Sequence, residues 1–437
     1  MSGDLKMTLH PERIDNLTPE QYQDILKRSR ADVTSILDDV REIVRDVREN
    51  GEQVFLDYYR KEYKSDLTLE DLEVSKEEVA EAYRHVDSKV IDALHVAAQN
   101  ITTFHQAQME REMWSVDIAN GILAGRMTTP LEKVGAYIPG GRASYPSTVL
   151  MTLLPGKVAG VKEIIACSPP GKGMVIAPAT LIAADIAGPV RIFKVGGPWA
   201  IASMAYGTET IPRVDKIVGP GNKYVTAAKT IVFGEVDIDS PAGPSEGMAL
   251  ADETGNADLI AIDLLSQAEH DPDSAAILVT PSDDLAARVS ESINKRLPGL
   301  PRKEILDSSL ARYSCILIAR DMDQAIDFVN EYAPEHLEIM TQDPITTLKK
   351  IRNAGSIFLG PFSPIPVGDY ASGTNHVLPT GQTARMFSGL SVDDFIKKPT
   401  FQYLSKDGLS SLKDTVVTLA EAEGLPLHAR TIVERFK

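Results

Sequence analysis

From about Lys133 onward, short apolar runs alternate with longer stretches of helical spacing, and this alternation restricts the fold more than any other feature of the sequence. The first apolar runs are KVGAYIP, EIIACS, RIFKVG and DKIVGPG, and helical patterns lie near residues 148–160, 178–187, 198–206 and 222–233. Strands that alternate with helices are typical of a parallel sheet. The sequence therefore predicts an α/β fold for this region.

A second array of the same kind follows. The strand-like runs AAILVT, CILIAR and SIFLG are separated by helical patterns that start at about residue 283 and near 322–332. Two incomplete Rossmann-like parallel sheets explain both arrays with the fewest assumptions.

Helices are predicted at both ends of the chain. Thr18 and Pro19 suit the N-cap and first position of a helix whose apolar residues continue through Ile25 and Val33 to a stop at Asn50-Gly51. After Ser388 the sequence is again predicted to be helical and ends in LKDTVVTLAEAEGLPLHARTIVERF, whose apolar face needs a partner surface.

Charge and composition exclude several classes of protein. Forty-five basic and 62 acidic residues give a formal net charge of −17, which disfavours a nucleic-acid partner. The first residues form no apolar signal, and no apolar stretch is long enough to span a membrane, so we expect no membrane partner and a cytoplasmic location. Cys167 and Cys315 each lie in a strand-like run and are predicted to pack in the core.

The eight histidines fall into two groups. Four lie in the helical N-terminal quarter and are expected to be solvated or packed: His10, His85, His95 and His105. The other four each lie near a Pro or Gly break and close to a carboxylate or an amide: His270, His336, His376 and His428. The second group is the candidate site.

Two local patterns in this group suggest chemistry. Gln267 and His270 are three residues apart near the end of a helical pattern, hence on one face, and such a pair can offer two ligands to a divalent ion such as Zn²⁺. The spacing alone also fits an ordinary helix. Glu335 and His336 are adjacent, so one side chain can act as a base while the other activates water, or both can be structural.

Glycine-rich turns follow several predicted strands. Gly219-Pro-Gly-Asn222 opens a helical pattern and can cradle an anion, although a tight turn explains it equally well. Ser245 lies in a GxSxG pattern, with Asp369 and His376 later in the chain, in the order of the α/β-hydrolases. A serine hydrolase is a remote alternative, because Pro241 and Pro244 fit a nucleophile elbow poorly.

Longer strings resemble one family. YIPGGRASYPS, YGTETIPRVDKIVGPGNKYV, DIDSPAGPSE, LLSQAEHDPDSAAILVT, PEHLE, GDYASGTNHVLPTGQTAR and AEGLPLHA occur in this order and together resemble histidinol dehydrogenase from about residue 30 to the C-terminus. That resemblance implies an enzyme of histidine biosynthesis that oxidises L-histidinol to L-histidine through bound L-histidinaldehyde, using two NAD⁺. It also implies an intertwined homodimer.

The resemblance implies roles for individual residues. The implied ligands of one Zn²⁺ per subunit are Gln267, His270, Asp369 and His428. The implied catalytic pair is Glu335 and His336, and substrate contacts fall on Ser245, His376 and Glu423, together with His336 and the zinc ligands. Tyr137 and Asn222 match positions that contact NAD.

The domain plan has four parts. An N-terminal segment spans 1–24, and a first Rossmann-like domain with the catalytic and metal residues combines 25–136 with 245–388. A second such domain, with the NAD contacts, spans 137–244, and a helical segment, 389–437, reaches the partner subunit.

One stretch departs from the family pattern. Where the family usually has Val-Gly-Gly-Ala-Gln-Ala, this chain has Val195-Gly-Gly-Pro-Trp-Ala200, so Trp199 replaces a glutamine that contacts NAD. A related NAD- and zinc-dependent dehydrogenase of another polar alcohol is therefore the main alternative. Because His336 must be neutral to act as a base, activity is expected to rise from mildly acid to alkaline pH.

Overall fold

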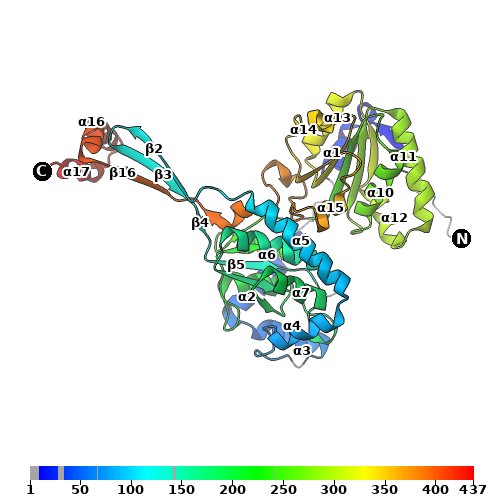
Figure 1. The fold of residues 1–437 in the computed structure, drawn as a ribbon, viewed down its shortest axis with the longest axis horizontal. Coiled ribbons are helices and arrows are strands. Elements are labelled where there is room, and N and C mark those ends of the chain that lie inside the picture. The colour runs from blue at the N-terminus through cyan, green and yellow to red at the C-terminus, as the bar shows by residue number, and fades with distance from the viewer. Residues whose placement is uncertain (1–8, 28–33, 66, 141–143, 242) are drawn as a thin grey trace. The chain divides into compact units, whose positions relative to one another are not determined.

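The structure, a computed structural model, describes residues 9–27, 34–65, 67–140, 144–241 and 243–437. Two parallel sheets organise most of it (Figure 1). The smaller sheet has the order β7-β6-β5-β8-β9 and all its neighbours are parallel. Its strands are β5 (Lys133–Tyr137), β6 (Glu163–Cys167), β7 (Arg191–Phe193), β8 (Lys216–Val218) and β9 (Asp237–Ile238).

Helices connect these strands as the sequence predicts. They are α6 (Pro146–Ala159), α7 (Pro178–Ala187), α8 (Gly197–Tyr206) and α9 (Lys223–Val232). The strand order is that of an incomplete Rossmann sheet. Successive strands are added on one side of β5 up to β7, and the order then reverses, so that β8 lies on the other side of β5. Ligands bind such sheets at the carboxyl ends of the strands beside this reversal.

The larger sheet has the order β1-β12-β11-β10-β13-β14, again parallel throughout. Its strands are β1 (Pro11–Arg13), β10 (Glu246–Ala251), β11 (Ala275–Thr280), β12 (Cys315–Ile318), β13 (His336–Met340) and β14 (Ser356–Leu359). Strands β10 to β14 repeat the Rossmann order, and β1 extends one edge. The predicted α/β fold with two Rossmann-like sheets is therefore confirmed.

Helices cover both faces of the larger sheet, so its central strands β10, β11 and β13 are buried along their whole length (Figure 1). One core contains α10 (Ala257–Ala268), α11 (Asp283–Arg296) and α12 (Lys303–Arg312). The opposite core contains α1 (Pro19–Lys27) and α13 (Met322–Tyr332), with α14 (Pro344–Leu348) at its margin. The short helix α15 (Ile365–Tyr370) follows β14.

The predicted N-terminal helix is two helices. Thr18 caps α1 as expected, since its hydroxyl accepts a hydrogen bond from the backbone N–H of Gln21. The second helix, α2 (Leu37–Asn50), ends before Gly51. Val33 lies outside the described residues. Leu26 of α1 packs in a core of the larger sheet, whereas Val40 of α2 packs with the smaller sheet. The apolar residues that the sequence assigned to one helix therefore pack into two different cores.

The remaining N-terminal helices also accompany the smaller sheet. They are α3 (Gln53–Tyr63), α4 (Lys76–His85) and α5 (Ser88–Gln106). Side chains of α3 share its core, and α4 and α5 contact α7 and α6. This differs from the predicted plan, which grouped residues 25–136 with the larger sheet, because the helical period reports that a face is buried but not which sheet buries it.

Residues 109–131 and 396–437 form a separate compact unit. It contains an antiparallel sheet of β2 (Met113–Ala119), β3 (Ile122–Met127) and β16 (Thr400–Leu404), the short pair β4 (Thr129–Pro130) and β15 (Ile396–Lys397), and helices α16 (Lys406–Ala422) and α17 (Pro426–Glu434). The prediction that 389–437 is helical missed β15 and β16.

Short 3-10 turns complete the described elements: η1 (Ile14–Asn16), η2 (Thr34–Ile36), η3 (Lys172–Met174), η4 (Leu297–Gly299), η5 (Thr383–Arg385) and η6 (Val392–Phe395). Among the described helices, none combines the length and apolar character needed to cross a membrane.

Candidate active site and cofactor turn

Gln267 lies over the amino ends of β10 and β13. Gly247 of β10 pairs with His336 of β13, and a Cβ on Gly247 would lie 2.4 Å from Cγ of Gln267. The Gln267 side chain, from the last turn of α10, therefore occupies the space that Gly247 leaves open beside His336. It is 1% exposed, and within the described part of the chain neither its amide oxygen nor its amide nitrogen has a hydrogen-bond partner. A buried amide without a partner is costly, which suits a position that holds a ligand.

Glu335 and His336 are both buried and are fixed by one neighbour. The backbone N–H of Glu246 donates to Oε2 of Glu335 at 2.8 Å, and Nδ1 of His336 lies 3.1 Å from the carbonyl oxygen of Glu246. Nδ1 of His336 is also 3.4 Å from Oε2 of Glu335. The predicted pair therefore lies together, at the first residue of β13 and the residue before it.

Asp369 and His376 adjoin this pair. Oδ1 of Asp369, at the end of α15, lies 3.4 Å from Nε2 of His336. Nδ1 of His376 lies 2.7 Å from the Asp369 carbonyl oxygen, and its Nε2 lies 3.1 Å from the hydroxyl of Thr148 in α6. His270 is exposed just beyond α10. Glu335, His336 and Asp369 thus lie together, and the pairing of Gly247 with His336 places Gln267 beside them.

Burial and charge act in opposite directions on these groups. Burial favours the neutral form of His336, but the Glu335 charge and the contact with Asp369 outweigh it and hold the pKa of His336 well above its usual value. Burial also raises the pKa of Asp369, but the contact with His336 and the nearby His376 and His270 together outweigh burial, so that this pKa falls below its usual value. The Asp369 carboxylate is therefore ionised, as a metal ligand must be.

A buried carboxyl pair lies beneath the site. Asp263 of α10 and Glu338 of β13 are hydrogen-bonded to each other, and Oε1 of Glu338 accepts from the N–H of Ile365 in α15. Burial raises the pKa of Asp263 to about 6, and burial with the Asp263 charge raises that of Glu338 well above its usual value. One shared proton therefore joins the three elements that carry Gln267, His336 and Asp369.

Three predicted residues have different surroundings. Ser245 is half-buried directly before β10, and a strand follows it rather than a helix, so the geometry of a hydrolase nucleophile elbow is absent there. Glu423 and His428 are exposed in the separate unit, at the end of α16 and in α17. Across the described residues, no three or more His, Cys, Asp or Glu side chains form a group able to hold a metal ion.

The predicted cofactor residues lie at the carboxyl ends of the smaller sheet. Tyr137 ends β5, and Asn222 follows β8, so both adjoin the reversal of strand order. Oδ1 of Asn222 caps α9 by accepting from the N–H groups of Tyr224 and Val225, which leaves its amide N–H₂ for other partners. A Cβ on Gly219 would lie 2.2 Å from the Tyr137 carbonyl oxygen, so only glycine allows the turn to approach β5 so closely.

Trp199 lies in the first turn of α8, at the same edge of the sheet. Its ring lies 4.4 Å from that of Tyr58, centroid to centroid, with the planes inclined by 33°. The N–H of Gly197 donates to the hydroxyl of Tyr137 at 3.1 Å, and the N–H of Gly196 donates to that of Tyr59. Trp199, which stands where the family usually has glutamine, therefore extends an aromatic cluster beside the first turn of α8.

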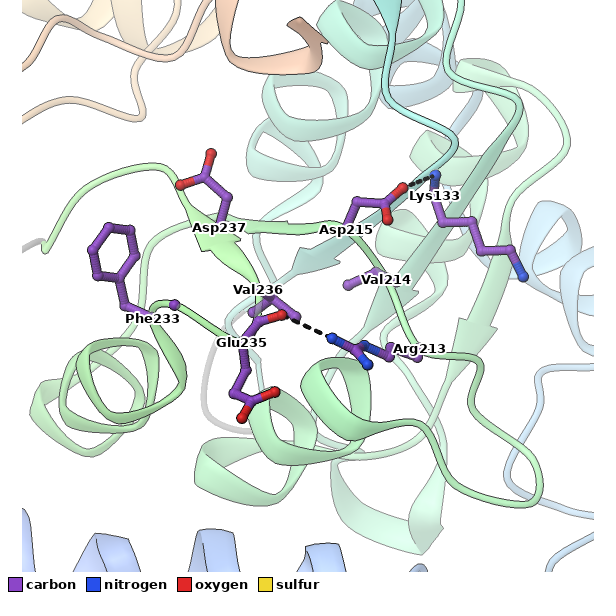
Figure 2. A pocket seen from close by; sticks show the side chains of 9 residues that line it. Lys133, Arg213, Val214, Asp215, Phe233, Glu235, Val236 and Asp237 are labelled. Carbon is purple, nitrogen blue, oxygen red and sulfur yellow. Dashed lines mark hydrogen bonds between the residues drawn. The ribbon is translucent and has the colours of Figure 1, made fainter. Parts of the chain in front are cut away.

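A surface cavity of about 430 Å³ lies at the opposite edge of this sheet (Figure 2). Lys133 begins β5, Asp237 begins β9, and Asp215 directly precedes β8, so the cavity lies at the amino ends of the strands. Its two cations are already engaged, Lys133 with Glu163 and Arg213 with the Glu235 carbonyl. It contains none of the predicted site residues.

Sequence reasoning missed Glu246. Its backbone holds both Glu335 and His336, and its Oε1 accepts from the N–H of Gly381. An acidic residue directly before the apolar run GMALA was a usable signal, because a charge at the start of a buried strand requires a partner.

Comparison with known proteins agrees with the geometry. A family model described as histidinol dehydrogenase matches residues 26–436. A histidinol dehydrogenase of Methanocaldococcus jannaschii is 51% identical over 98% of this chain and 98% of its own, and one of Methanothermobacter thermautotrophicus is 49% identical over 97% and 99%. A crystal structure of histidinol dehydrogenase from Elizabethkingia anophelis matches with a TM-score of 0.92 and 39% identity, over 99% of this chain and 98% of that one.

Proposed function

The chain belongs to the histidinol dehydrogenase family, an NAD-dependent oxidoreductase family of histidine biosynthesis, and from that premise we propose how its residues carry out the reaction. The substrate is L-histidinol and the product L-histidine, formed through bound L-histidinaldehyde with two NAD⁺. The observation that carries the proposal is the buried amide of Gln267, which has no hydrogen-bond partner among the residues that the structure describes, beside the cluster of Glu335, His336 and Asp369.

The residues fit a metal. The Gln267 amide oxygen, the ionised Asp369 carboxylate and two imidazoles, from His270 and His428, would hold one Zn²⁺ per subunit. When bound, the metal supplies a Lewis acid that fixes the substrate's imidazole and amine. NAD⁺ supplies the hydride acceptor for each step.

The catalytic pair divides the proton transfers. In the first step the neutral form of His336 accepts the hydroxyl proton of histidinol as hydride leaves the carbinol carbon, which yields the aldehyde; because the pKa of His336 is raised, this form increases as the pH rises. In the second step Glu335 accepts a proton from the water that attacks the aldehyde carbon, and loss of a second hydride from the hydrate gives the carboxylic acid. Because Glu246 holds both side chains through its backbone, the two bases keep a fixed relation to each other.

Other residues bind the substrate and the cofactor. Ser245, His376 and Glu423 contact histidinol, and Tyr137, Trp199 and Asn222 contact NAD. Among the described residues the helix cap uses only the amide oxygen of Asn222, and this, with the position of Tyr137 and Asn222 at the strand reversal, supports the cofactor role. Trp199, held against Tyr58, offers NAD an aromatic face where a glutamine is usual.

The proposed enzyme is a cytoplasmic homodimer whose C-terminal helices complete the partner's site. Support comes from apolar side chains exposed in the separate unit: Met113, Trp114, Val116, Ile118, Leu419 and Leu427. Patches of this kind mark protein interfaces. Cys167 and Cys315 are free thiols, as in proteins of a reducing compartment.

Separable half-reactions test the catalytic pair. Glu335→Gln should form NADH in the first turnover at nearly the wild-type rate, because His336 is retained, but its oxidation of histidinol to histidine should fall by about 100-fold or more. Rapid-mixing measurement of NADH, with the aldehyde trapped by a hydrazine reagent, separates the steps. Equal loss of both steps would show that Glu335 also serves the first.

A hybrid dimer tests which subunit supplies His428 to each active site. One chain carries His336→Ala and the other His428→Ala, and two affinity tags isolate the hybrid after co-expression. If the C-terminal helices act in the partner's site, one site collects both lesions and the other has neither, so the hybrid regains about half of the wild-type activity. A folded, zinc-loaded hybrid as inactive as both parent homodimers would place His428 in its own chain's site.

A further inference from the structure

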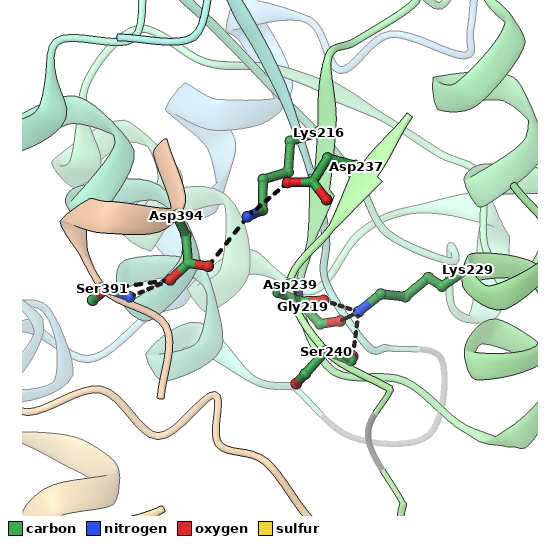
Figure 3. Close-up of polar contacts among 8 residues, drawn as sticks. All are labelled: Lys216, Gly219, Lys229, Asp237, Asp239, Ser240, Ser391 and Asp394. Carbon is green, nitrogen blue, oxygen red and sulfur yellow. Dashed lines mark hydrogen bonds and ion pairs between the residues drawn. The ribbon is translucent and has the colours of Figure 1, made fainter. Parts of the chain in front are cut away.

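Lys229 of α9 is a buried cation that the proposed mechanism does not use. It is 3% exposed, and its ammonium group donates to the carbonyl oxygens of Gly219 and Ser240, at 3.1 and 3.2 Å, and to Oδ1 of Asp239 (Figure 3). An ammonium group has three hydrogens, so all of them have an oxygen partner. Such a cation is retained only where its partners are fixed around it.

The ion pair of Lys229 and Asp239 binds both backbone groups of Gly219. While Lys229 binds the Gly219 carbonyl, Oδ2 of Asp239 accepts from the Gly219 N–H at 2.7 Å. Gly219 has a φ of +115° and lies against the end of β5, and three residues later Asn222 caps α9. The turn 219–222 is therefore fixed at its start by the ion pair and at its end by the cap.

The same ammonium reaches a second functional segment. Asp239 and Ser240 directly follow β9, and the chain continues through Ser245 into β10 of the larger sheet. Ser240 is buried, and its carbonyl is held by Lys229. One side chain thus holds both the turn that bears Asn222 and the start of the segment that bears Ser245.

We propose that Lys229 and Asp239 are positioning residues that hold the turn 219–222 in the conformation that binds NAD and fix it relative to the segment leading to Ser245. This inference rests on the proposed contact between Asn222 and NAD. Neither residue touches the cofactor; each acts through Gly219 and Ser240. Loss of the pair should weaken NAD binding while the chemical step at saturating NAD⁺ is largely preserved.

The chain offers a matched control. Lys216 is also buried and forms ion pairs at 3.1 Å, with Asp237 and with Asp394 (Figure 3). It begins β8, however, at the edge of the sheet opposite the turn. Lys216→Met therefore removes a comparable buried cation of the same sheet without touching residues 219–222.

The experiment compares the zinc-loaded full chain with the double variant Lys229→Met/Asp239→Asn, which leaves no uncompensated charge, and with Lys216→Met. NADH affinity is measured by energy transfer from tryptophan, and KM for NAD⁺ and kcat are measured separately. We expect the double variant to raise the NADH Kd and the KM for NAD⁺ by about tenfold or more, with kcat within about threefold of wild type. Lys216→Met should leave the NADH Kd within about twofold. If the double variant does not fold, Lys229→Gln, whose amide still donates, takes its place.

Each result decides between the claims. A folded double variant with wild-type NADH affinity overturns the inference, and so does an equal loss in Lys216→Met, since that loss would reflect general destabilisation. Asn222→Ser keeps the helix cap but loses the amide donors. If Asn222→Ser binds NADH as tightly as wild type, the proposed cofactor contact is wrong, whereas weaker binding there with unchanged binding in the double variant rejects the positioning role alone.

Discussion

Gly247→Ala tests whether Gln267 is a metal ligand. A methyl group at Gly247 would lie 2.4 Å from Cγ and 3.0 Å from Cβ of Gln267, whereas carbon atoms in contact are normally about 3.5–4.0 Å apart. The Gln267 side chain must therefore move by about 1 Å. A displacement of that size at a catalytic site costs on the order of 100-fold in rate. Mutation of a residue that orients a metal ligand typically lowers metal affinity by about 10- to 100-fold.

The assay measures zinc affinity by competition with a chromophoric chelator, and kcat with saturating histidinol and NAD⁺. We expect both to fall by about 10- to 100-fold, with a stability loss of only about 1–3 kcal/mol, typical of overpacking. Gly299→Ala is the control, because an added Cβ there meets no atom within 4 Å. A Gly247→Ala enzyme with wild-type zinc affinity and kcat would refute the placement of the Gln267 amide at the metal.

Two further predictions concern the metal and the carboxyl pair. Exhaustive chelation should abolish activity and added Zn²⁺ should restore it, as followed by NADH formation; full activity in metal-free protein would remove zinc from the mechanism. The raised pKa values of Asp263 and Glu338 mean that their shared proton stabilises the fold fully below about pH 4 and that this stability is lost as the pH rises through about 6. Glu338→Gln keeps a donor without that proton, so the free energy of unfolding in urea should decline less between pH 5 and pH 8 than that of wild type, and equal declines would argue against the shared proton.

The sequence predicts strands well where function does not interfere. The strand-like runs at β11, β12 and β14 are almost entirely apolar because helices cover both faces of the sheet. Strands β10 and β13 were missed, since each begins with a polar site residue, Glu246 or His336, that breaks the apolar pattern. Site residues at strand ends obscure the local signal for the strands that carry them.

The site itself was only partly predictable. Helical spacing brings Gln267 and His270 to one face, but their approach to His336 depends on the register between β10 and β13, whose paired residues are 89 positions apart. The contacts of Lys229 likewise join a helix to two separate turns. Long-range pairing of this kind leaves no trace in local periodicity, and neither does the choice of sheet for α1 and α2.

The most direct test of the account is the stoichiometry of oxidation. The zinc-loaded enzyme is given a limiting amount of L-histidinol with excess NAD⁺, and NADH and L-histidine are measured at completion. Oxidation in two steps by His336 and Glu335 predicts two NADH and one histidine for each histidinol, with no free aldehyde. One NADH per histidinol, with aldehyde released and no histidine formed, would contradict it.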